Sequence, residues 1–305
     1  MSYFFAIAIP YAAVITSVVG IIVRVSKWAN APVPFRIPTT CGQQKSLPWI
    51  RSSNLDNPHS TPGVIGRMAL EILLFRSLFR NTKADLTPGP KLVYGSSKWL
   101  WLGALAFHWS LLIVVLRHLR LFAEPQPYFV TLIQNLDGFF QAGLPAVYLT
   151  DAILLAALTY LFARRIADAK LRYISLAADY VPLLLTGGIA LTGILMRHFY
   201  KVDLRSVKEL AMGLIRLHPV VPDGIGILFY IHLFLVSTLL AYFPFSKLVH
   251  MGGIFLSPTR NLANNNRMRR HVNPWNHDVK VHTYEEYEDE FRNVMAAAEL
   301  PLEKG

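Results

Sequence analysis

Four histidines lie in two long apolar stretches of this chain, and imidazole is both a metal ligand and an acid–base group. His108 and His118 belong to FHWSLLIVVLRHLR, and His232 and His250 belong to YIHLFLVSTLLAYFPFSKLVH. An ionisable side chain is costly inside an apolar segment, so such residues are candidates for a functional role. What they can do depends on whether the two stretches meet, and at which level each histidine then lies.

The composition is typical of a membrane protein with several spans. Of 305 residues, 53% are hydrophobic and only 16% are charged, against about 25% charged in a soluble domain. The net charge of +11 could indicate nucleic-acid binding, but basic loops between membrane spans explain it, and no nucleic-acid-binding motif is present. The single Cys41 excludes an intramolecular disulfide and any multi-cysteine cluster held by this chain alone.

Five apolar blocks predict an all-α membrane protein, a bundle of five transmembrane helices. The blocks cover residues 3–23, 99–121, 146–162, 175–196 and 225–251. Each is close to the roughly 20 residues that cross the hydrocarbon core of a bilayer, and the fifth is longer. The first is not expected to be a cleaved signal peptide, because its basic residues, Arg24 and Lys27, follow the apolar run instead of preceding it.

The distribution of Lys and Arg predicts the orientation of the bundle. Segments 24–98 and 164–172, together with the end of the chain from Lys247, carry most of these residues. Because basic residues mark the cytoplasmic side, we expect the N-terminus outside and the C-terminus in the cytoplasm. The expected division is a first transmembrane helix (1–25), a long cytoplasmic loop (26–97), transmembrane helices two to five (98–251) and a cytoplasmic tail (252–305).

Each cytoplasmic segment contains one predicted amphipathic helix. In TPGVIGRMALEILLFRSLFRN, Thr61 is expected to cap a helix that lies on the membrane surface or packs on a partner subunit. In the tail, Thr283 and Glu286 form a capping box. The apolar stripe of that helix comprises Tyr284, Tyr287, Phe291 and Val294. We interpret the tail helix as a docking element for a cytoplasmic partner; a solvent-exposed extension is the alternative.

Spans two and five run in opposite directions, which sets the depth of each histidine. His108 and His250 then lie toward the cytoplasm, and His118 and His232 lie toward the outside. At 1.5 Å per residue, the separations of ten and eighteen residues correspond to about 15 and 27 Å along a helix. Eighteen residues are also five full turns, so His232 and His250 would share a face. Pro244, which lies between them, is a candidate for a bend.

Two histidine pairs at different depths favour two b-type haems over zinc. Zinc requires three or four ligands around one point, whereas bis-histidine iron needs one imidazole from each of two helices. Small residues that could admit the macrocycle are Gly103, Ala106, Gly187, Gly188 and Gly193. The alternative interpretations are interfacial histidines without a ligand, and glycines that serve helix packing alone.

The five spans and the histidine spacings resemble the gamma subunit family of respiratory nitrate reductases, which are dihaem cytochromes b. The resemblance implies that His108 and His250 bind the iron of a cytoplasmic-side haem, and that His118 and His232 bind the iron of an outer haem. It also implies an electron-transferring subunit of a quinone-linked oxidoreductase, in the cell (inner) membrane.

The segments outside the spans resemble one branch of this family. TTCGQQKSLPWIRSSNLDNP, SPTRNLANNNRMRRHVNPWN and VHTYEEYEDEF are similar to segments of M subunits from Dsr membrane complexes of dissimilatory sulfite reduction. This resemblance implies a cytoplasmic iron–sulfur partner of heterodisulfide-reductase type, further membrane and periplasmic subunits, and menaquinone as the substrate. The nitrate reductase subunit has no such long first loop, so we expect a different partner here.

The resemblance also implies a quinone site beside the outer haem. Candidate proton acceptors there are Asp151, His198 and Lys201, because quinol oxidation releases protons. Arg117, Arg120 and Arg197 are candidates for contacts with haem propionates or the quinone. An ion pair between Asp151 and one of these arginines is the alternative. For Cys41, an approach to the partner's redox centre and an incidental position both stay open.

Two other functions remain alternatives. The chain could be a haem-free membrane anchor that recruits a cytoplasmic redox complex, or the cytochrome b subunit of another respiratory reductase such as nitrate reductase. A transporter is disfavoured, because few charges lie within the spans and no paired broken helices are evident.

Overall fold

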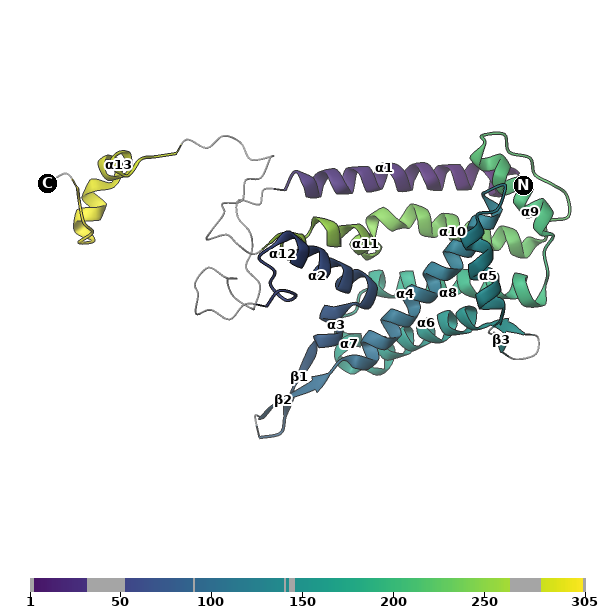
Figure 1. The fold of residues 1–305 in the computed structure, drawn as a ribbon, viewed down its shortest axis with the longest axis horizontal. Coiled ribbons are helices and arrows are strands. Elements are labelled where there is room, and N and C mark those ends of the chain that lie inside the picture. Colours follow the sequence, from purple (N-terminus) through teal and green to yellow (C-terminus); the bar gives the residue numbers. More distant parts are fainter. Residues whose placement is uncertain are drawn as a thin grey trace.

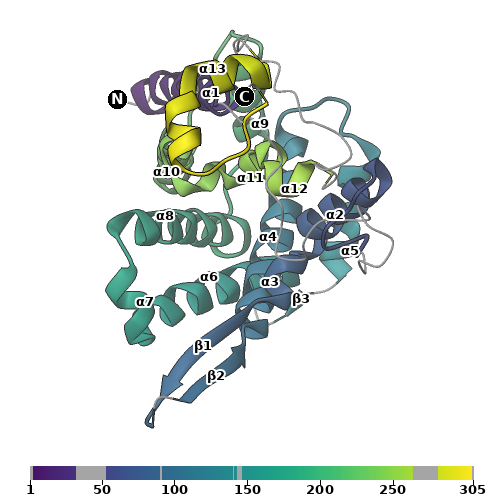
Figure 2. The same ribbon diagram turned by 90° about the vertical axis from the view of Figure 1, so that its left-hand side faces the viewer.

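The structure is a computed structural model that describes residues 3–31, 53–89, 91–139, 141–142, 146–263 and 281–303. It is mostly helical, with the long helices side by side in one bundle (Figures 1 and 2). Cys41 and much of the Asn- and Arg-rich part of the tail lie outside the described residues.

Four helices among the described residues are long and apolar enough to cross a membrane. They are Phe4–Ala29, Lys98–Leu121, Ala177–Phe199 and Ile227–Phe245. Their main parts are α1 (Ile9–Ala29), α4 (Lys98–His118), α8 (Ala177–Ile194) and α10 (Ile227–Tyr242). Short end helices complete them: η1 (Phe4–Ala8), η2 (Leu119–Leu121), η3 (Leu195–Phe199) and η4 (Phe243–Phe245).

The predicted third span corresponds to α6 (Leu149–Ala167), which is not among those four apolar helices. It begins with Asp151 in its first turn and ends with Arg164 and Arg165 in its last turn, and these charges lower its apolar character. It nevertheless packs between α4 and α8 inside the bundle. The finding is therefore four candidate spans and a fifth long helix packed among them.

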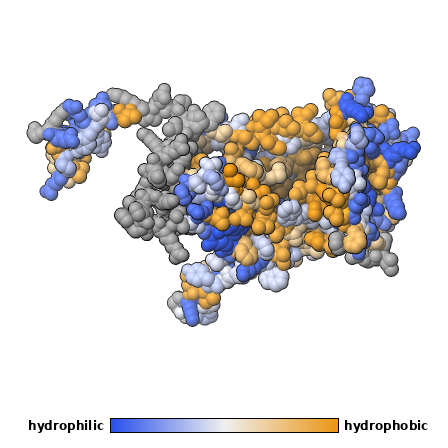
Figure 3. All heavy atoms as spheres, viewed as in Figure 1, coloured by the Kyte–Doolittle hydropathy of each residue, from blue (hydrophilic) through white to orange (hydrophobic). Residues whose placement is uncertain are grey.

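The long helices pack in the order α4, α6, α8, α10 and α1. Many of their apolar side chains are exposed, and apolar atoms cover the middle of the bundle in Figure 3, between polar ends. Such an exposed apolar girdle is the arrangement that a bilayer stabilises. α4 carries His108 and His118, and α10 carries His232. These two helices are not joined by close backbone packing.

The predicted fifth span is not one continuous helix. α10 ends at Tyr242, and η4, η5 (Lys247–Val249), α11 (His250–Gly253) and η6 (Ile254–Leu256) follow it. Pro244 has no backbone N–H to donate, and its ring clashes with the preceding turn, which favours a kink or the end of an α-helix. Ser246 is extended, and its hydroxyl accepts the Leu248 N–H at 3.1 Å to start the next turn. The expectation that His232 and His250 share one face of a single helix is therefore wrong.

The segment before α4 folds back toward the bundle. α2 (Thr61–Leu74) and α3 (Arg76–Arg80) meet at Phe75, which has a positive φ of 50°. Ser60, and not Thr61 as predicted, is the N-cap residue of α2. α2 packs on α12 (Pro258–Asn261), where Arg260 pairs with the buried Glu71 at 3.0 Å. Part of the predicted amphipathic helix is thus covered by this chain itself.

Two small hairpins correct the prediction of an all-α chain. β1 (Thr82–Thr87) pairs antiparallel with β2 (Lys91–Ser96), and Gly89 in their turn has a φ of +90°. β3 (Gln141–Ala142) pairs with β4 (Val147–Tyr148). The first hairpin lies in the predicted loop, where Pro88 and Gly89 are a turn signal but the mostly exposed strands lack apolar alternation.

Four further helices lie outside the long ones. They are α5 (Tyr128–Phe139), α7 (Ala169–Ile174), α9 (Leu204–Ile215) and α13 (Tyr284–Ala297). α9 buries Val207 and Leu210 against Ala6 and Ile225, and so covers one end of the bundle. In α13 the predicted capping box of Thr283 and Glu286 is confirmed.

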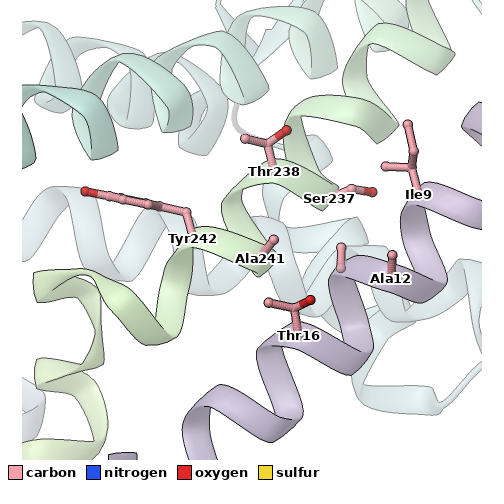
Figure 4. Close-up of a pocket in the computed structure, with 8 residues that line it drawn as sticks. Ile9, Ala12, Thr16, Ser237, Thr238, Ala241 and Tyr242 are labelled. Carbon is pink, nitrogen blue, oxygen red and sulfur yellow. The ribbon is translucent and has the colours of Figure 1, made fainter.

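A groove of about 400 Å³ separates parts of α1 and α10 (Figure 4). Its lining residues are Ile9, Ala12, Ala13, Thr16, Ser237, Thr238, Ala241 and Tyr242. None of the four span histidines lines it, so it is distinct from the site developed below.

Candidate functional site

The structure brings the four span histidines together as two crossed pairs. The ring centres of His108 on α4 and His250 at the start of α11 are 6.0 Å apart, with an 81° angle between the rings. The ring centres of His118, the last residue of α4, and His232 on α10 are 6.4 Å apart, and these rings are nearly parallel at 11°. Helices that are not in close backbone contact therefore meet through these imidazoles.

All four rings use Nδ1 for a hydrogen bond within the protein. His108 Nδ1 is 2.8 Å from the Ala104 carbonyl, and His118 Nδ1 is 2.7 Å from the Val114 carbonyl. His250 Nδ1 is 2.8 Å from the Lys247 carbonyl, and His232 Nδ1 is 2.8 Å from the Thr192 hydroxyl. Such bonds fix the tautomer and orientation of a metal-binding histidine and leave Nε2 for the metal.

The ring separations fit one metal ion between the two imidazoles of each pair. Two metal–nitrogen bonds of about 2 Å each, plus roughly 1 Å from each nitrogen to its ring centre, give ring centres about 6 Å apart. Among the described residues, no group of three or more His, Cys, Asp or Glu side chains could hold a metal ion. Two protein ligands for each metal suit a haem iron, whose other four ligands come from the macrocycle.

The glycines near these pairs have different roles. A Cβ added to Gly193 would lie 3.3 Å from His232 Cε1. The absence of a side chain at Gly193 therefore leaves room for the His232 ring. A Cβ at Gly103 would instead lie 2.6 Å from Tyr160, so Gly103 permits helix packing of α4 on α6. The alternative of helix packing therefore holds for Gly103.

The segment before α4 contributes to the first pair in a way that the sequence did not indicate. Phe75 lies edge-on to His108, with ring centres 4.9 Å apart, as does Phe107. Two indole N–H groups of α4 hold the end of α2: Trp101 donates to the Leu74 carbonyl at 2.7 Å and Trp109 to the Leu73 carbonyl at 3.0 Å. The helix predicted to lie on the membrane surface or to pack on a partner subunit thus ends against His108, a candidate ligand.

A buried polar network begins at Arg117, the residue before His118 of the His118–His232 pair. Arg117 pairs with both Asp137 of α5 and Asp151 of α6, and all three residues are buried. His198 Nε2 lies 3.0 Å from the second oxygen of Asp151. The ion pair that was the alternative interpretation of Asp151 is therefore present, and the same carboxylate also holds a histidine.

Tyr148 completes the network from β4. The guanidinium carbons of Arg117 and Arg197 lie 4.9 and 5.1 Å from its ring centre, within the range of cation–π attraction. Arg197 donates to its hydroxyl at 2.6 Å, and His198 lies edge-on to its ring. Of the other predicted site residues, Lys201 is exposed, and neither Lys201 nor Arg120 joins these hydrogen bonds.

Sequence reasoning missed Asp137, Thr150 and Tyr148. The Thr150 hydroxyl donates to Asp137 at 2.6 Å, and its backbone N–H reaches the other oxygen at 3.4 Å. The available signal was the amphipathic run YFVTLIQNLDGF of α5, in which a single acid near the helix end stands among apolar residues. Its buried partner could not be identified without the fold.

Comparison with known proteins decides the family. Residues 69–271 match the model of the nitrate reductase gamma subunit family. The chain belongs to this family. The matched range includes both histidine pairs and the Arg117–Asp151–His198 network, and membership implies haem as the cofactor and a redox role in a multi-pass membrane protein.

Two relatives are similar to most of the chain. The Hdr-like menaquinol oxidoreductase cytochrome b-like subunit of Archaeoglobus fulgidus is 46% identical over 278 residues, which are 89% of this chain and 83% of that protein. The protein of the same name from Archaeoglobus profundus is 42% identical over 275 residues, 88% of this chain and 81% of its own. The family resemblance expected from the sequence is thus confirmed, and both names fit an M-type cytochrome b of the Dsr branch.

Proposed function

We propose that this chain is the dihaem cytochrome b subunit of a membrane complex that exchanges electrons between menaquinone and a cytoplasmic iron–sulfur subunit of heterodisulfide-reductase type. In this proposal the complex serves dissimilatory sulfur metabolism and includes further membrane and periplasmic subunits. The names of the two relatives support the quinol and heterodisulfide-reductase parts. The segments outside the spans support the sulfur branch.

The observation that carries the proposal is the crossed arrangement of the histidines. His108 and His250 would bind the iron of one haem, and His118 and His232 that of another, each through Nε2. When bound, each haem carries one electron as its iron cycles between the ferric and ferrous states. The ten residues from His108 to His118 would place these two ligands, and so the two haems, at different depths, about 15 Å apart along α4.

The proposed orientation assigns a partner to each haem. With α6 counted as the third span, the chain has five spans, its N-terminus outside and its C-terminus in the cytoplasm, because basic residues gather on the cytoplasmic side. We call the haem at His118 and His232 the outer haem, and place the quinone site beside it. The haem at His108 and His250 then faces the segment that ends at Phe75 and the cytoplasmic partner.

The polar network suits quinone chemistry at the outer haem. Oxidation of a quinol releases two electrons and two protons, so the site needs groups that bind protons as well as an electron acceptor. Asp151 and His198 are hydrogen-bonded to each other, and Arg117 beside them is the residue before His118. Arg120, Arg197 and Lys201 remain candidates for contacts with the haem propionates or the quinone.

A haem assay tests the proposal. Protein purified from membranes should contain two b-type haems per chain, and His118→Ala should lose the outer haem and keep the other. His218→Ala is the matched control, because His218 is exposed and its Nδ1 lies 3.2 Å from the neighbouring Leu217 carbonyl. Fewer than two haems per chain, or an unchanged spectrum in His118→Ala, would contradict the proposal, and a complete absence of haem would favour the haem-free anchor.

Quinone and partner identity need a second experiment. The reduced complex should be reoxidised by a menaquinone analogue, and a heterodisulfide-reductase-like subunit should be isolated with it. Isolation with a nitrate-reducing subunit instead would favour the alternative of a nitrate reductase cytochrome b.

A further inference from the structure

The network beside His118 holds equal numbers of positive and negative charges when His198 is neutral. Arg117 and Arg197 carry one positive charge each, and Asp137 and Asp151 carry one negative charge each. The side chains of Asp151 and His198 are only 8% and 6% exposed. A proton on His198 would add one positive charge, which would compensate the positive charge that the iron loses when the outer haem is reduced.

The hydrogen bonds of His198 show which nitrogen can gain that proton. Nε2 is held by Asp151, so a neutral imidazole carries its hydrogen there and has Nδ1 as the acceptor. The other oxygen of Asp151 is paired with Arg117. The carboxylate therefore orients the imidazole and stabilises its charged form, as in other Asp–His pairs.

The local helix geometry places this imidazole. His198 lies in η3, a π-helical turn at the end of α8, and such turns are frequent at functional sites. The turn brings His198 to Asp151 and Arg197 to the Tyr148 hydroxyl. Two consecutive residues thus join the same network from one turn.

We infer that His198 binds a proton when the outer haem gains an electron, and returns it to water when that electron leaves. The inference rests on the proposed function, because it requires haem at His118 and His232. His198 is the proton-binding residue and Asp151 is its positioning residue. In the balanced step one electron from the quinol pool converts ferric to ferrous iron, and one proton converts neutral His198 to its imidazolium form.

The physical cause of this coupling is electrostatic. Reduction removes one positive charge from the iron, and the sequence neighbour of its ligand His118 is paired with the carboxylate that holds His198. In an interior of low dielectric constant such a change raises the proton affinity of a nearby base. The charged or titratable groups that face His198 or Asp151 are Arg117 and His118 on α4, Asp137 on α5, Tyr148 on β4 and Arg197 on η3.

The test is the pH dependence of the outer-haem midpoint potential in the purified complex. The outer haem is identified as the one lost in His118→Ala. Protonation stabilises the reduced form, so the potential should fall as pH rises near neutrality. In His198→Gln most of this slope should be lost, while the other haem keeps its behaviour. In Asp151→Asn the slope should also change, because the imidazole has lost the carboxylate that orients it.

His218→Gln is the matched control and should keep the full slope, since it removes an exposed histidine elsewhere. A His198→Gln complex with two haems and an unchanged slope would overturn the inference, as would a pH-independent potential in the unsubstituted complex. Loss of haem from the unsubstituted protein would instead contradict the proposed function. If His198→Gln does not fold, redox-difference infrared spectra of the unsubstituted complex must still show an imidazolium ion forming on reduction; its absence would also overturn the inference.

Discussion

Arg117 and Asp137 form a buried ion pair that joins the end of a long apolar helix to a short helix outside it. Arg117 is the residue before His118, so the pair also fixes the backbone next to a proposed iron ligand. Thr150 donates to the same carboxylate, which connects the start of α6 to this point. One carboxylate thus links α4, α5 and α6 at the end of the bundle where the second histidine pair lies.

Removing the Asp137 charge should destabilise the protein. Breaking a buried ion pair typically lowers the free energy of unfolding by about 3–5 kcal/mol. The loss in Asp137→Asn should be near the lower value, because Arg117 keeps its ion pair with Asp151. The measurement is the midpoint of thermal unfolding in detergent. Asp203→Asn is the matched control: Asp203 is the exposed N-cap residue of α9, where Asn caps equally well. Equal midpoints for both variants would contradict a structural role for the Arg117–Asp137 pair.

A side chain at Gly193 should disturb the outer haem selectively. The added Cβ of Gly193→Ala lies 3.3 Å from His232 Cε1, and the larger Gly193→Val should displace the ring further. We expect a shifted spectrum or a reduced content of one haem, measured by optical spectroscopy of the purified protein. Gly66→Ala on α2, whose Cβ would make an ordinary contact with Leu55 at 3.6 Å, should leave both haems unchanged. An equal effect of the two alanine variants would argue against a special requirement at Gly193.

Acid should release the segment that covers the first histidine pair. A hydrogen bond from Arg76, with further charge from Arg80, holds the pKa of Asp56 below its usual range. Because the folded-state pKa is lowered, the stabilisation is present above the ordinary value of about 4 and is lost as pH falls through the lower folded value. Cleavage by pepsin between residues 53 and 80 should therefore accelerate below pH of about 4.

Asp56→Asn should be cleaved faster than the unsubstituted protein at pH of about 4–5, and the two rates should converge at lower pH. Asp203→Asn again serves as the control, because Asp203 lies on a different element and does not contact this segment. Identical cleavage of the Asp56→Asn and unsubstituted proteins throughout would show that the Asp56 pair does not hold the segment.

Cysteine labelling tests the proposed orientation. Tyr128, 80% exposed at the start of α5, should face outward, and Tyr173, 91% exposed on α7, should face the cytoplasm. In a Cys41→Ser background, a membrane-impermeant maleimide should label Tyr128→Cys in intact spheroplasts and Tyr173→Cys only in inverted vesicles. Labelling of both from the same side would require an even number of spans between α5 and α7 and would exclude α6 as a span.

Polar substitution of the α13 stripe should weaken binding of the cytoplasmic partner. Tyr287 and Phe291 are 49% and 39% exposed, and their ring centres are 4.8 Å apart on one face of the helix. Tyr287→Ser with Phe291→Ser should lower the amount of partner subunit isolated with the full-length chain. Asn293→Ser, on the opposite face, should not. Unchanged recovery of the partner with the stripe variant would favour the alternative of a solvent-exposed extension.

Local pattern was sufficient to predict several features. The lengths of the apolar blocks predicted four helices that the structure also contains, and the S/T-x-x-E spacing predicted the capping box at Thr283. The opposite directions of spans two and five predicted which histidines meet. These features depend on the spacing of residues along one helix or on the relative direction of two helices, and both can be deduced from the order of the residues.

Other features were not predicted correctly from the sequence, because they depend on segments that fold back onto the bundle. Pro244 indicated a bend, but the new helical turn that starts at Ser246 and carries His250 was not predicted. Phe75 contacts His108 only because the chain changes direction between α2 and α3. The N-cap position of α2 is occupied by Ser60 and not by Thr61 as predicted. The β1–β2 hairpin turns at Pro88 and Gly89, which are a turn signal, but its mostly exposed strands lack the apolar alternation that would predict their pairing.

The sequence by itself determined the class of protein, its apolar helices and the two histidine pairs, since hydrophobicity and helical rise act over neighbouring residues. Only the tertiary structure decided the polar surroundings of the second pair. Asp137, Asp151 and His198 come from three separate elements, and each buried charge is stable only with the partner that the fold brings to it. No spacing within one helix encodes such a contact, because the connections between helices set which charged groups meet.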